Sequence, residues 1–522
     1  MAVCAGHQEI VRLLLEREDI DPNTPDTKSG RTPLWEAVCA KHEEIVRLLL
    51  ERKDIDPNTP VTKSGTTPLM VAVRAGHEAI VRLLLEREDI DLNTPDTKSG
   101  RTPLWEAVCA KHEEIVGLLL ERKDIDPNTP VTKSGTTPLM VAVRAGHEAI
   151  ARLLLEREDI DLNTPDIECG RTPLWEAVCA KHEAIARLLL EREDINPNTP
   201  DTEFGRAPLW EAVCAKHEEI VRLLLEREDI DLNTPDTEFG RTPLWKAASD
   251  GHEEIVRLLL EREDISPNTP DTKFGRTPLS EAASEGHEEI VRLLLEREAI
   301  NPNTLDTEFG RTPLREAARC GHEEIARLLL EREDINPNTP DTEFGRTPLW
   351  KAASDGHEEI VRLLLEREDI NPNTPDTEDG STPLFEAARC EHEEIVKMLL
   401  KRGHVNPNTP DTEYGQTPLM LAAIGGYEGI VKLLLEREDL NPNTRDLSGK
   451  TAFELATSRE HKGVVQLLSQ PNSPPIPIGT KRTEILGRET LPQGAITDSN
   501  NKRKIHLGDE GNPRKKHRAP FT

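Results

Sequence analysis

The chain has 522 residues, of which 31% are charged and 8 are cysteine, and its net charge is −31. The last 52 residues hold ten Lys/Arg against five Asp/Glu, so residues 1–470 carry a net charge of −36. Such an acidic surface repels phosphate backbones, which excludes nucleic acid as the direct ligand of residues 1–470 and favours a protein partner.

The cysteine content and the length of the apolar runs argue against a disulfide-rich protein and a membrane-spanning protein. The cysteines are too few for a disulfide framework, and no apolar run approaches the ~20 residues of a membrane span. We therefore predict a soluble intracellular protein, cytoplasmic or nuclear or both, without membrane contact.

A repeat of 35 residues organises most of the sequence. The pattern Gly-x-Thr-Pro-Leu, with Ala207 in one threonine place, has its glycine at Gly30, Gly65, Gly100, Gly135, Gly170, Gly205, Gly240, Gly275, Gly310, Gly345, Gly380 and Gly415. A shorter, altered copy starts at Gly449. A period of this size indicates stacked supersecondary units. Each unit is named below by its first glycine.

The Gly30 unit illustrates the predicted elements in chain order. Thr32 caps a helix that starts at Pro33, because a missing N–H costs nothing at the first helical position. Lys41-His42 forms a turn, and a second helix follows with a buried stripe at Ile45, Val46, Leu48 and Leu49. Residues 54–64 are rich in turn formers and predict a projecting loop.

This helix–turn–helix–loop unit resembles the ankyrin repeat. The clearest copy of the family's second motif, Gly-His-Glu-x-Ile-Val-x-Leu-Leu-Leu, runs from Gly251 to Leu260, and the match covers residues 1–469. The resemblance, nearest to the long arrays of filamentous fungi, implies an all-α solenoid that binds partners along a concave groove and at its loop tips.

Two features depart from the family pattern. Trp, Met, Phe, Ser or Arg replaces the histidine after Thr-Pro-Leu, and only Gly403 keeps the glycine that follows the second helix. The repeat is also two residues longer than the usual 33. We expect the longer loop to end the second helix differently.

The repeats divide the chain into four predicted parts. Residues 1–29 form a truncated first repeat, residues 30–448 twelve full repeats, residues 449–469 a closing repeat, and residues 470–522 a disordered basic tail. Met1 aligns with Glu36, so the sequence starts inside a first helix, and the first unit lacks the polar outer face of a terminal repeat. Either that unit frays or the sequence is a fragment of a longer protein.

Side chains that vary on an unchanging frame are the predicted partner contacts. The ninth and tenth places after each glycine vary most, and in the family these places line the groove. The predicted contacts are Asp250, Glu285, Arg319, Asp355 and Arg389. The alternative is neutral drift after duplication, since residues 30–99 and 100–169 differ at only five places.

The repeated residues do not predict a catalytic, cofactor or metal site. Cys39-x-x-His42 recurs, but zinc needs four ligands within about 2.3 Å, whereas equivalent places on adjacent helices lie roughly 8–10 Å apart. We interpret the histidine as a tie for the inter-helix turn. The tryptophans either form an aromatic binding surface or stack against the next repeat. With no phosphate-binding loop or nucleophile motif, we expect a non-enzyme without cofactor.

The tail carries two basic clusters. Their spacing is typical of a bipartite nuclear import signal, and the alternative is a solubilising tail. The residues concerned are Lys502, Arg503, Lys504, Arg514, Lys515, Lys516 and Arg518.

Two functional hypotheses follow. The first is a monomeric scaffold or adaptor that binds a protein along the groove of the array. The second is the recognition or sensor array of a larger fungal regulator, whose amino-terminal effector domain would be nucleotide-binding or nucleosidase-like.

Overall fold

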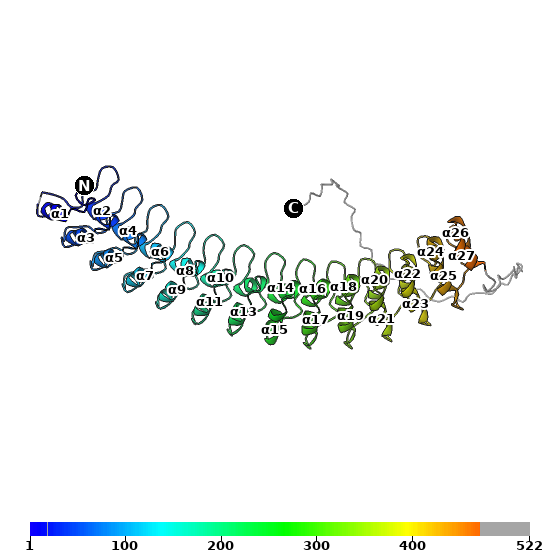
Figure 1. Cartoon of the computed structure of the whole chain (residues 1–522). Helices are drawn as coiled ribbons and strands as arrows, with labels where there is room; N and C mark the ends of the chain where they lie inside the picture. Colours follow the sequence, from blue (N-terminus) through cyan, green and yellow to red (C-terminus); the bar gives the residue numbers. More distant parts are fainter. Residues whose placement is uncertain (18, 470–522) are drawn as a thin grey trace, which may run out of the picture. The chain divides into compact units, whose positions relative to one another are not determined.

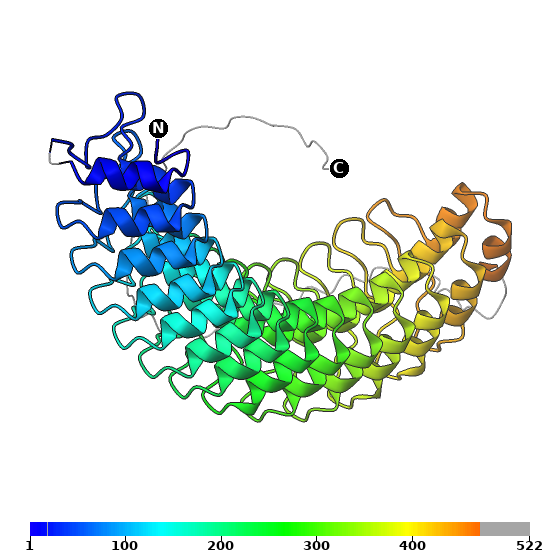
Figure 2. The ribbon, with the colours of Figure 1, turned by 60° about the vertical axis from the view of Figure 1, so that its left-hand side comes forward.

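The computed structural model describes residues 1–17 and 19–469; the predicted tail, with both basic clusters, lies outside the described residues. After the single helix α1 (Gln8–Leu15), the described residues form pairs of helices that stack side by side in one curved array, with long loops projecting from one edge (Figures 1 and 2). The described residues contain no strand, and the prediction of an all-α repeat solenoid is confirmed.

The first helix of each pair begins directly after the threonine place. These helices are α2 (Pro33–Cys39), α4 (Pro68–Arg74), α6 (Pro103–Cys109), α8 (Pro138–Arg144), α10 (Pro173–Cys179), α12 (Pro208–Cys214), α14 (Pro243–Asp250), α16 (Pro278–Glu285), α18 (Pro313–Cys320), α20 (Pro348–Asp355), α22 (Pro383–Arg389), α24 (Pro418–Gly425) and α26 (Ala452–Ser458).

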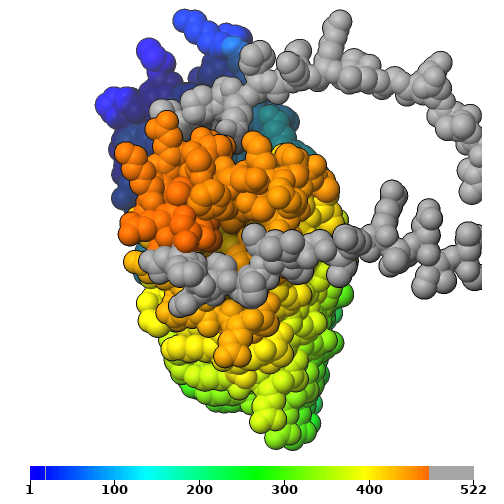
Figure 3. Space-filling view, turned by 90° about the vertical axis from the view of Figure 1, so that its right-hand side faces the viewer, coloured from blue at the N-terminus to red at the C-terminus, as the bar shows by residue number. Residues whose placement is uncertain are grey.

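The second helix begins one residue after the turn. These helices are α1 (Gln8–Leu15), α3 (Glu43–Leu50), α5 (Glu78–Leu85), α7 (Glu113–Leu120), α9 (Glu148–Leu155), α11 (Glu183–Leu190), α13 (Glu218–Leu225), α15 (Glu253–Glu261), α17 (Glu288–Leu295), α19 (Glu323–Leu330), α21 (Glu358–Glu366), α23 (Glu393–Lys401), α25 (Glu428–Leu435) and α27 (Lys462–Leu468). Side chains of α26 and α27 form one end of the array (orange in Figure 3).

Threonine and proline start the first helix as predicted. The amide of Trp35 donates to Oγ1 of Thr32 at 3.2 Å, and Pro33 occupies the first helical position. Ala207 offers no such acceptor, yet α12 still begins at Pro208. Threonine is therefore not required for α12 to begin, and in α2 it adds one capping hydrogen bond.

The core lies between neighbouring units. In the Gly240 unit, Leu244, Ala247, Ile255 and Val256 have no exposed side-chain surface, and the same places are buried along the array. First helices contact their neighbours more closely than second helices do, since small alanines lie on their buried faces. This difference bends the array toward the first helices (Figure 2).

The turn between the helices contains a residue in the left-handed region. Glycine occupies this place in many units, as at Gly251 with φ of 74°. Lysine occupies it elsewhere, as at Lys41 and Lys216 with φ of 58° and 56°. Because left-handed backbone strains a residue with a Cβ, the lysine units carry a local conformational cost.

An Arg–Asp clamp follows the second helix, in place of the family's glycine. Nε and Nη2 of Arg87 donate to the carboxylate of Asp89 at 2.8 and 2.6 Å. Nη1 of Arg87 donates to the carbonyl oxygens of Leu50 and Arg52 in the preceding unit, at 3.2 and 3.1 Å. The residue after the helix, Glu86, stays right-handed. The expectation that this helix ends differently is confirmed, and the clamp satisfies carbonyl groups at a helix end.

A ladder of asparagines joins the loops of successive units. Nδ2 of Asn58 donates to the carbonyl oxygen of Asp89 at 2.7 Å, and its Oδ1 accepts from the amide of Asp91 at 2.7 Å. The same two bonds are made by Asn23, Asn93, Asn128, Asn163, Asn198, Asn233, Asn268, Asn303, Asn338, Asn373 and Asn408. Each loop is thereby held in register with the next unit.

Candidate partner-binding surface

The five predicted contacts lie at the C-terminal ends of successive first helices. Asp250, Glu285, Asp355 and Arg389 are the last residues of α14, α16, α20 and α22, and Arg319 is the last but one of α18. Arg319 is half-buried and the other four are exposed. Because adjacent helices lie roughly 8–10 Å apart, these residues form a row of three negative and two positive side chains, the charged row.

Two acids of the charged row are paired with lysines of their own helices. Nζ of Lys246 lies 2.9 Å from the carboxylate of Asp250, and Nζ of Lys351 lies 2.9 Å from that of Asp355. No ion pair to Glu285 occurs among the described residues. Glu285 is therefore the acid of the row that most readily meets an incoming cation.

The two arginines of the charged row are paired with buried glutamates. Nη2 of Arg319 lies 2.7 Å from Glu316, and Nε of Arg389 donates to Glu386 at 3.0 Å. The bond to Glu386 raises the pKa of Arg389. Both guanidinium groups are thus held in one orientation by glutamates of their own helices.

Variation at the ninth place is partly compensated inside the array. Arg74 reaches Glu106 of the next unit, 2.8 Å away. Arg319 has Lys351 at the equivalent place of its next unit and pairs instead with Glu316 of its own helix. From the sequence, variation at the ninth place is explained by partner binding or by neutral drift, and neither explanation includes this ion pair between units.

A buried cluster of charges supports Arg319 from below. Arg315 stands where many units have tryptophan, is 4% exposed, and bonds Asp341 of the next unit at 2.6 Å. Arg311 and Arg319 contact the buried carboxylate of Glu316 at 3.3 and 2.7 Å. Burial lowers the pKa of Arg315. Burial acts to raise the pKa of Glu316, but the arginines outweigh it and that pKa is lowered. Sequence reasoning missed this cluster, although a charge in the tryptophan place was its signal.

The tryptophans stack against the next repeat and do not form an exposed aromatic surface. Trp245 is 2% exposed, and its Nε1 donates to the carbonyl oxygen of Arg276 in the next unit at 2.8 Å. The guanidinium of Arg241 lies 4.3 Å from the centre of the same ring. The aromatic ring therefore contributes to stacking between units.

In many units the histidine that precedes the second helix forms a hydrogen bond to the preceding unit. The sequence predicted that it would stabilise the turn of its own unit instead. Nε2 of His287 donates to the carbonyl oxygen of Ser249 at 3.0 Å, and Nδ1 of His77 donates to that of Val38 at 3.1 Å. Nε2 makes this bond in His287, where the turn residue of the preceding unit is Gly251. Nδ1 makes it in His77, where that turn residue is Lys41. A Cβ at Gly251 would lie 2.7 Å from Cε1 of His287, so a lysine at that place makes the ring shift.

Metal-ligand clusters, membrane-spanning helices and disulfides are absent from the part of the chain that the structure describes. Within residues 1–17 and 19–469, no three His, Cys, Asp or Glu side chains converge as a metal site requires. None of the helices described is long and apolar enough to cross a membrane. All eight cysteines are free.

Stacked helix–turn–helix units with projecting loops define a repeat solenoid. The family model for ankyrin repeats (3 copies) matches the chain in overlapping segments, at residues 1–61, 59–131, 126–201, 193–271, 265–341, 333–411 and 403–475. The chain belongs to the ankyrin repeat family, as its resemblance indicated. A comparison with curated proteins found no match. Ankyrin repeats are generally protein–protein interaction modules.

Proposed function

We propose that this protein is a scaffold or adaptor that holds a protein partner across the charged row. The observation that carries the proposal is that five successive first helices each carry an acidic or basic residue within their last two positions, while the core beneath them stays nearly constant. A rigid frame with varied contact residues suits specific binding, because little conformational entropy is lost on association.

The charges of the row favour a partner surface that carries both signs. Asp250, Glu285 and Asp355 would meet basic groups, and Arg319 and Arg389 would meet carboxylates or carbonyl oxygens. Glu285 has no competing ion pair among the described residues, so we expect it to contribute most to partner choice.

Affinity capture with a row variant tests this function. In that variant Asp250, Glu285, Arg319, Asp355 and Arg389 are all changed to alanine. A matched control carries Glu263→Ala, Glu298→Ala and Glu368→Ala, which alter exposed residues after the second helices. Circular dichroism first establishes that both proteins keep the helical content of the wild type.

Binding proteins retained by the wild type and the control, but lost by the row variant, support the proposal. A protein captured equally by all three chains would place its binding surface elsewhere and contradict the proposed role of the charged row.

A further inference from the structure

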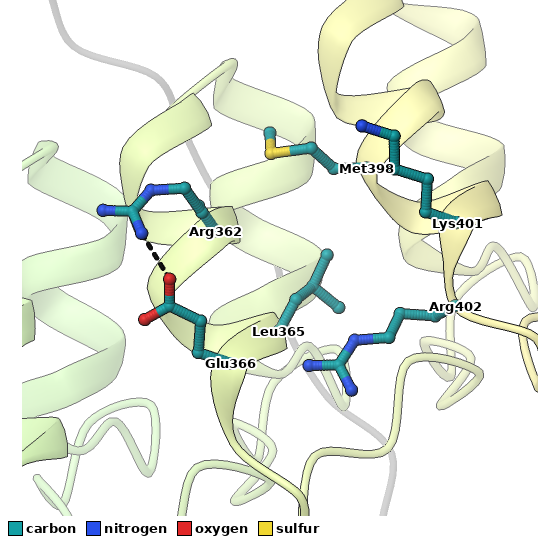
Figure 4. A pocket seen from close by; sticks show the side chains of 6 residues that line it. All are labelled: Arg362, Leu365, Glu366, Met398, Lys401 and Arg402. Carbon is teal, nitrogen blue, oxygen red and sulfur yellow. Dashed lines mark hydrogen bonds and ion pairs between the residues drawn. The ribbon is translucent and has the colours of Figure 1, made fainter.

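Two pockets occupy equivalent places on the second helices, five units apart. One, of about 230 Å³, lies between α11 and α13 and is lined by Arg187, Leu190, Glu191, Leu223, Glu226 and Arg227. The other, of about 460 Å³, lies between α21 and α23 and is lined by Arg362, Leu365, Glu366, Met398, Lys401 and Arg402 (Figure 4). The six lining residues of one pocket occupy the same repeat places as the six of the other. The two pockets can therefore be compared residue by residue.

The charge at the mouth of the pocket is inverted between the two sites. Lys401 stands where the first pocket has Glu226, and every other unit from residue 16 to residue 436 has glutamate at this place. Met398 replaces Leu223, and His404 replaces Asp229, the acid of the Arg–Asp clamp.

Because His404 stands in the place of that aspartate, Arg402 in the second pocket lacks the carboxylate that holds Arg227 in the first. Arg227 is held by Asp229 at 2.8 Å and by the carbonyl oxygen of Leu190 at 3.1 Å. The side chain of Arg402 makes no hydrogen bond or ion pair within residues 1–17 and 19–469, and it extends toward Leu365 (Figure 4). The second pocket is about twice as large as the first.

The pocket combines an apolar floor with two cations, Lys401 and Arg402, whose side chains make no ion pair or hydrogen bond among the described residues. Leu365 is buried and Met398 is half-buried against the core. Arg362 is engaged by Glu366 and Glu359 of its own helix, so the positive charge left for a ligand belongs to Lys401 and Arg402. This charge lies on an array whose first 470 residues carry −36.

We propose that this pocket binds an acidic peptide segment of another protein, with an apolar side chain between two acidic residues. Arginine accepts a carboxylate in a two-pronged geometry, and lysine adds a second point of attraction. Methionine adapts its shape to an inserted apolar side chain. A nucleic acid strand would meet repulsion from the surrounding acidic surface. The site lies on the second helices and does not depend on the charged row.

Fluorescence anisotropy with the full chain tests the proposal. The probe is a labelled peptide Glu-Glu-Leu-Glu-Glu, compared with Gln-Gln-Leu-Gln-Gln and Glu-Glu-Gly-Glu-Glu. We expect the first peptide to bind at least about tenfold more tightly than either control, because it alone supplies both the charges and the apolar side chain. Its binding should weaken as salt is added.

Two variants exchange the pockets' characters. The first carries Met398→Leu, Lys401→Glu, Gly403→Glu and His404→Asp, which are the residues that the same places hold in the Gly345 unit, so it is expected to fold. It should lose binding about tenfold or more. The second carries Leu223→Met, Glu226→Lys, Glu228→Gly and Asp229→His, and it should gain a second binding site of similar affinity.

The outcomes separate the proposal from its rivals. Loss of binding in the first variant together with a gain in the second supports it. Equal affinity of wild type and first variant for the acidic peptide overturns it. Tighter binding of oligothymidylate than of the acidic peptide also overturns it, because the pocket would then be a nucleic-acid site.

Discussion

At the scale of single residues, the left-handed place in each turn is where the units differ most in strain. Lys216 has φ of 56°, and its counterpart Gly251 has φ of 74°. Glycine adopts this conformation readily because it has no Cβ, whereas the Cβ of any other residue lies too close to the backbone. Strain is therefore concentrated in the units whose turn holds lysine or glutamate.

Lys216→Gly should stabilise its unit by about 1 kcal/mol, because it removes left-handed strain from a residue with a Cβ. Long repeat arrays do not unfold in one step, so the measurement is hydrogen exchange of the amides in α12 and α13.

The reverse change is the control. Gly251→Lys should reduce protection in α14 and α15, because its Cβ would also meet the ring of His287. Unchanged exchange in the Lys216→Gly protein would show that the turn carries no strain.

At the scale of elements, the helix ends are stabilised by bonds between units. The clamp requires its aspartate: in the Gly275 unit Ala299 replaces it, and Arg297 then has no side-chain hydrogen bond among the described residues. The backbone there is already in place, since Asn268 still bonds the carbonyl oxygen of Ala299.

Ala299→Asp should restore the clamp and stabilise the end of α17 by about 1 kcal/mol, the usual range for a well-aligned exposed pair. Hydrogen exchange in α15 and α17 measures this, because the restored bonds would join these helices. Asp334→Ala, which removes an existing clamp, should have the opposite effect, and a silent Ala299→Asp would contradict a stabilising role.

Asn338→Ala should weaken the boundary between the Gly310 and Gly345 units. It removes two exposed bonds, to the carbonyl oxygen of Asp369 at 2.8 Å and from the amide of Asn371 at 2.7 Å, and each such bond contributes about 0.5–1.5 kcal/mol. Faster exchange in the two loops checks this. Thr339→Ala next to it, whose side chain makes no bond among the described residues, should change little.

The bonds within a unit could be predicted from the sequence, whereas the bonds between units could not. The period, the Thr-Pro helix start and the apolar stripes predicted the helix pairs and the core, because such signals act within one unit. Asn58 and Arg87 could be interpreted only as a loop residue and a helix-end residue, since their partners lie 31 to 37 residues away. The charge cluster around Arg315 was likewise hidden, because burial depends on the neighbouring unit.

At the scale of the whole molecule, the clamps make the array sensitive to acid. Bonds from their arginines lower the pKa of Asp89, Asp124, Asp159 and Asp229. A pKa lowered in the folded state contributes stability that is present above the unfolded value, about 3.9, and is lost as pH falls through the folded value.

Helical content measured by circular dichroism should therefore stay constant from pH 7 down to about 4.5 and fall below about pH 4. Repulsion between the 66 Lys/Arg and 16 His charges would act in the same range. Added salt distinguishes the two causes: full recovery of helix at the same pH would assign the loss to repulsion and not to the clamps.

The register of the asparagine ladder also bears on how such a molecule changes over generations. Each asparagine bonds the unit that follows it, and every unit presents the same backbone groups at the same offset. If residues 100–169 were deleted, Asn93 would meet Asp194 in place of Asp124, and no bond would need repair. A gain or loss of whole units through replication slippage would thus preserve these bonds, so the length of the array can change in whole steps.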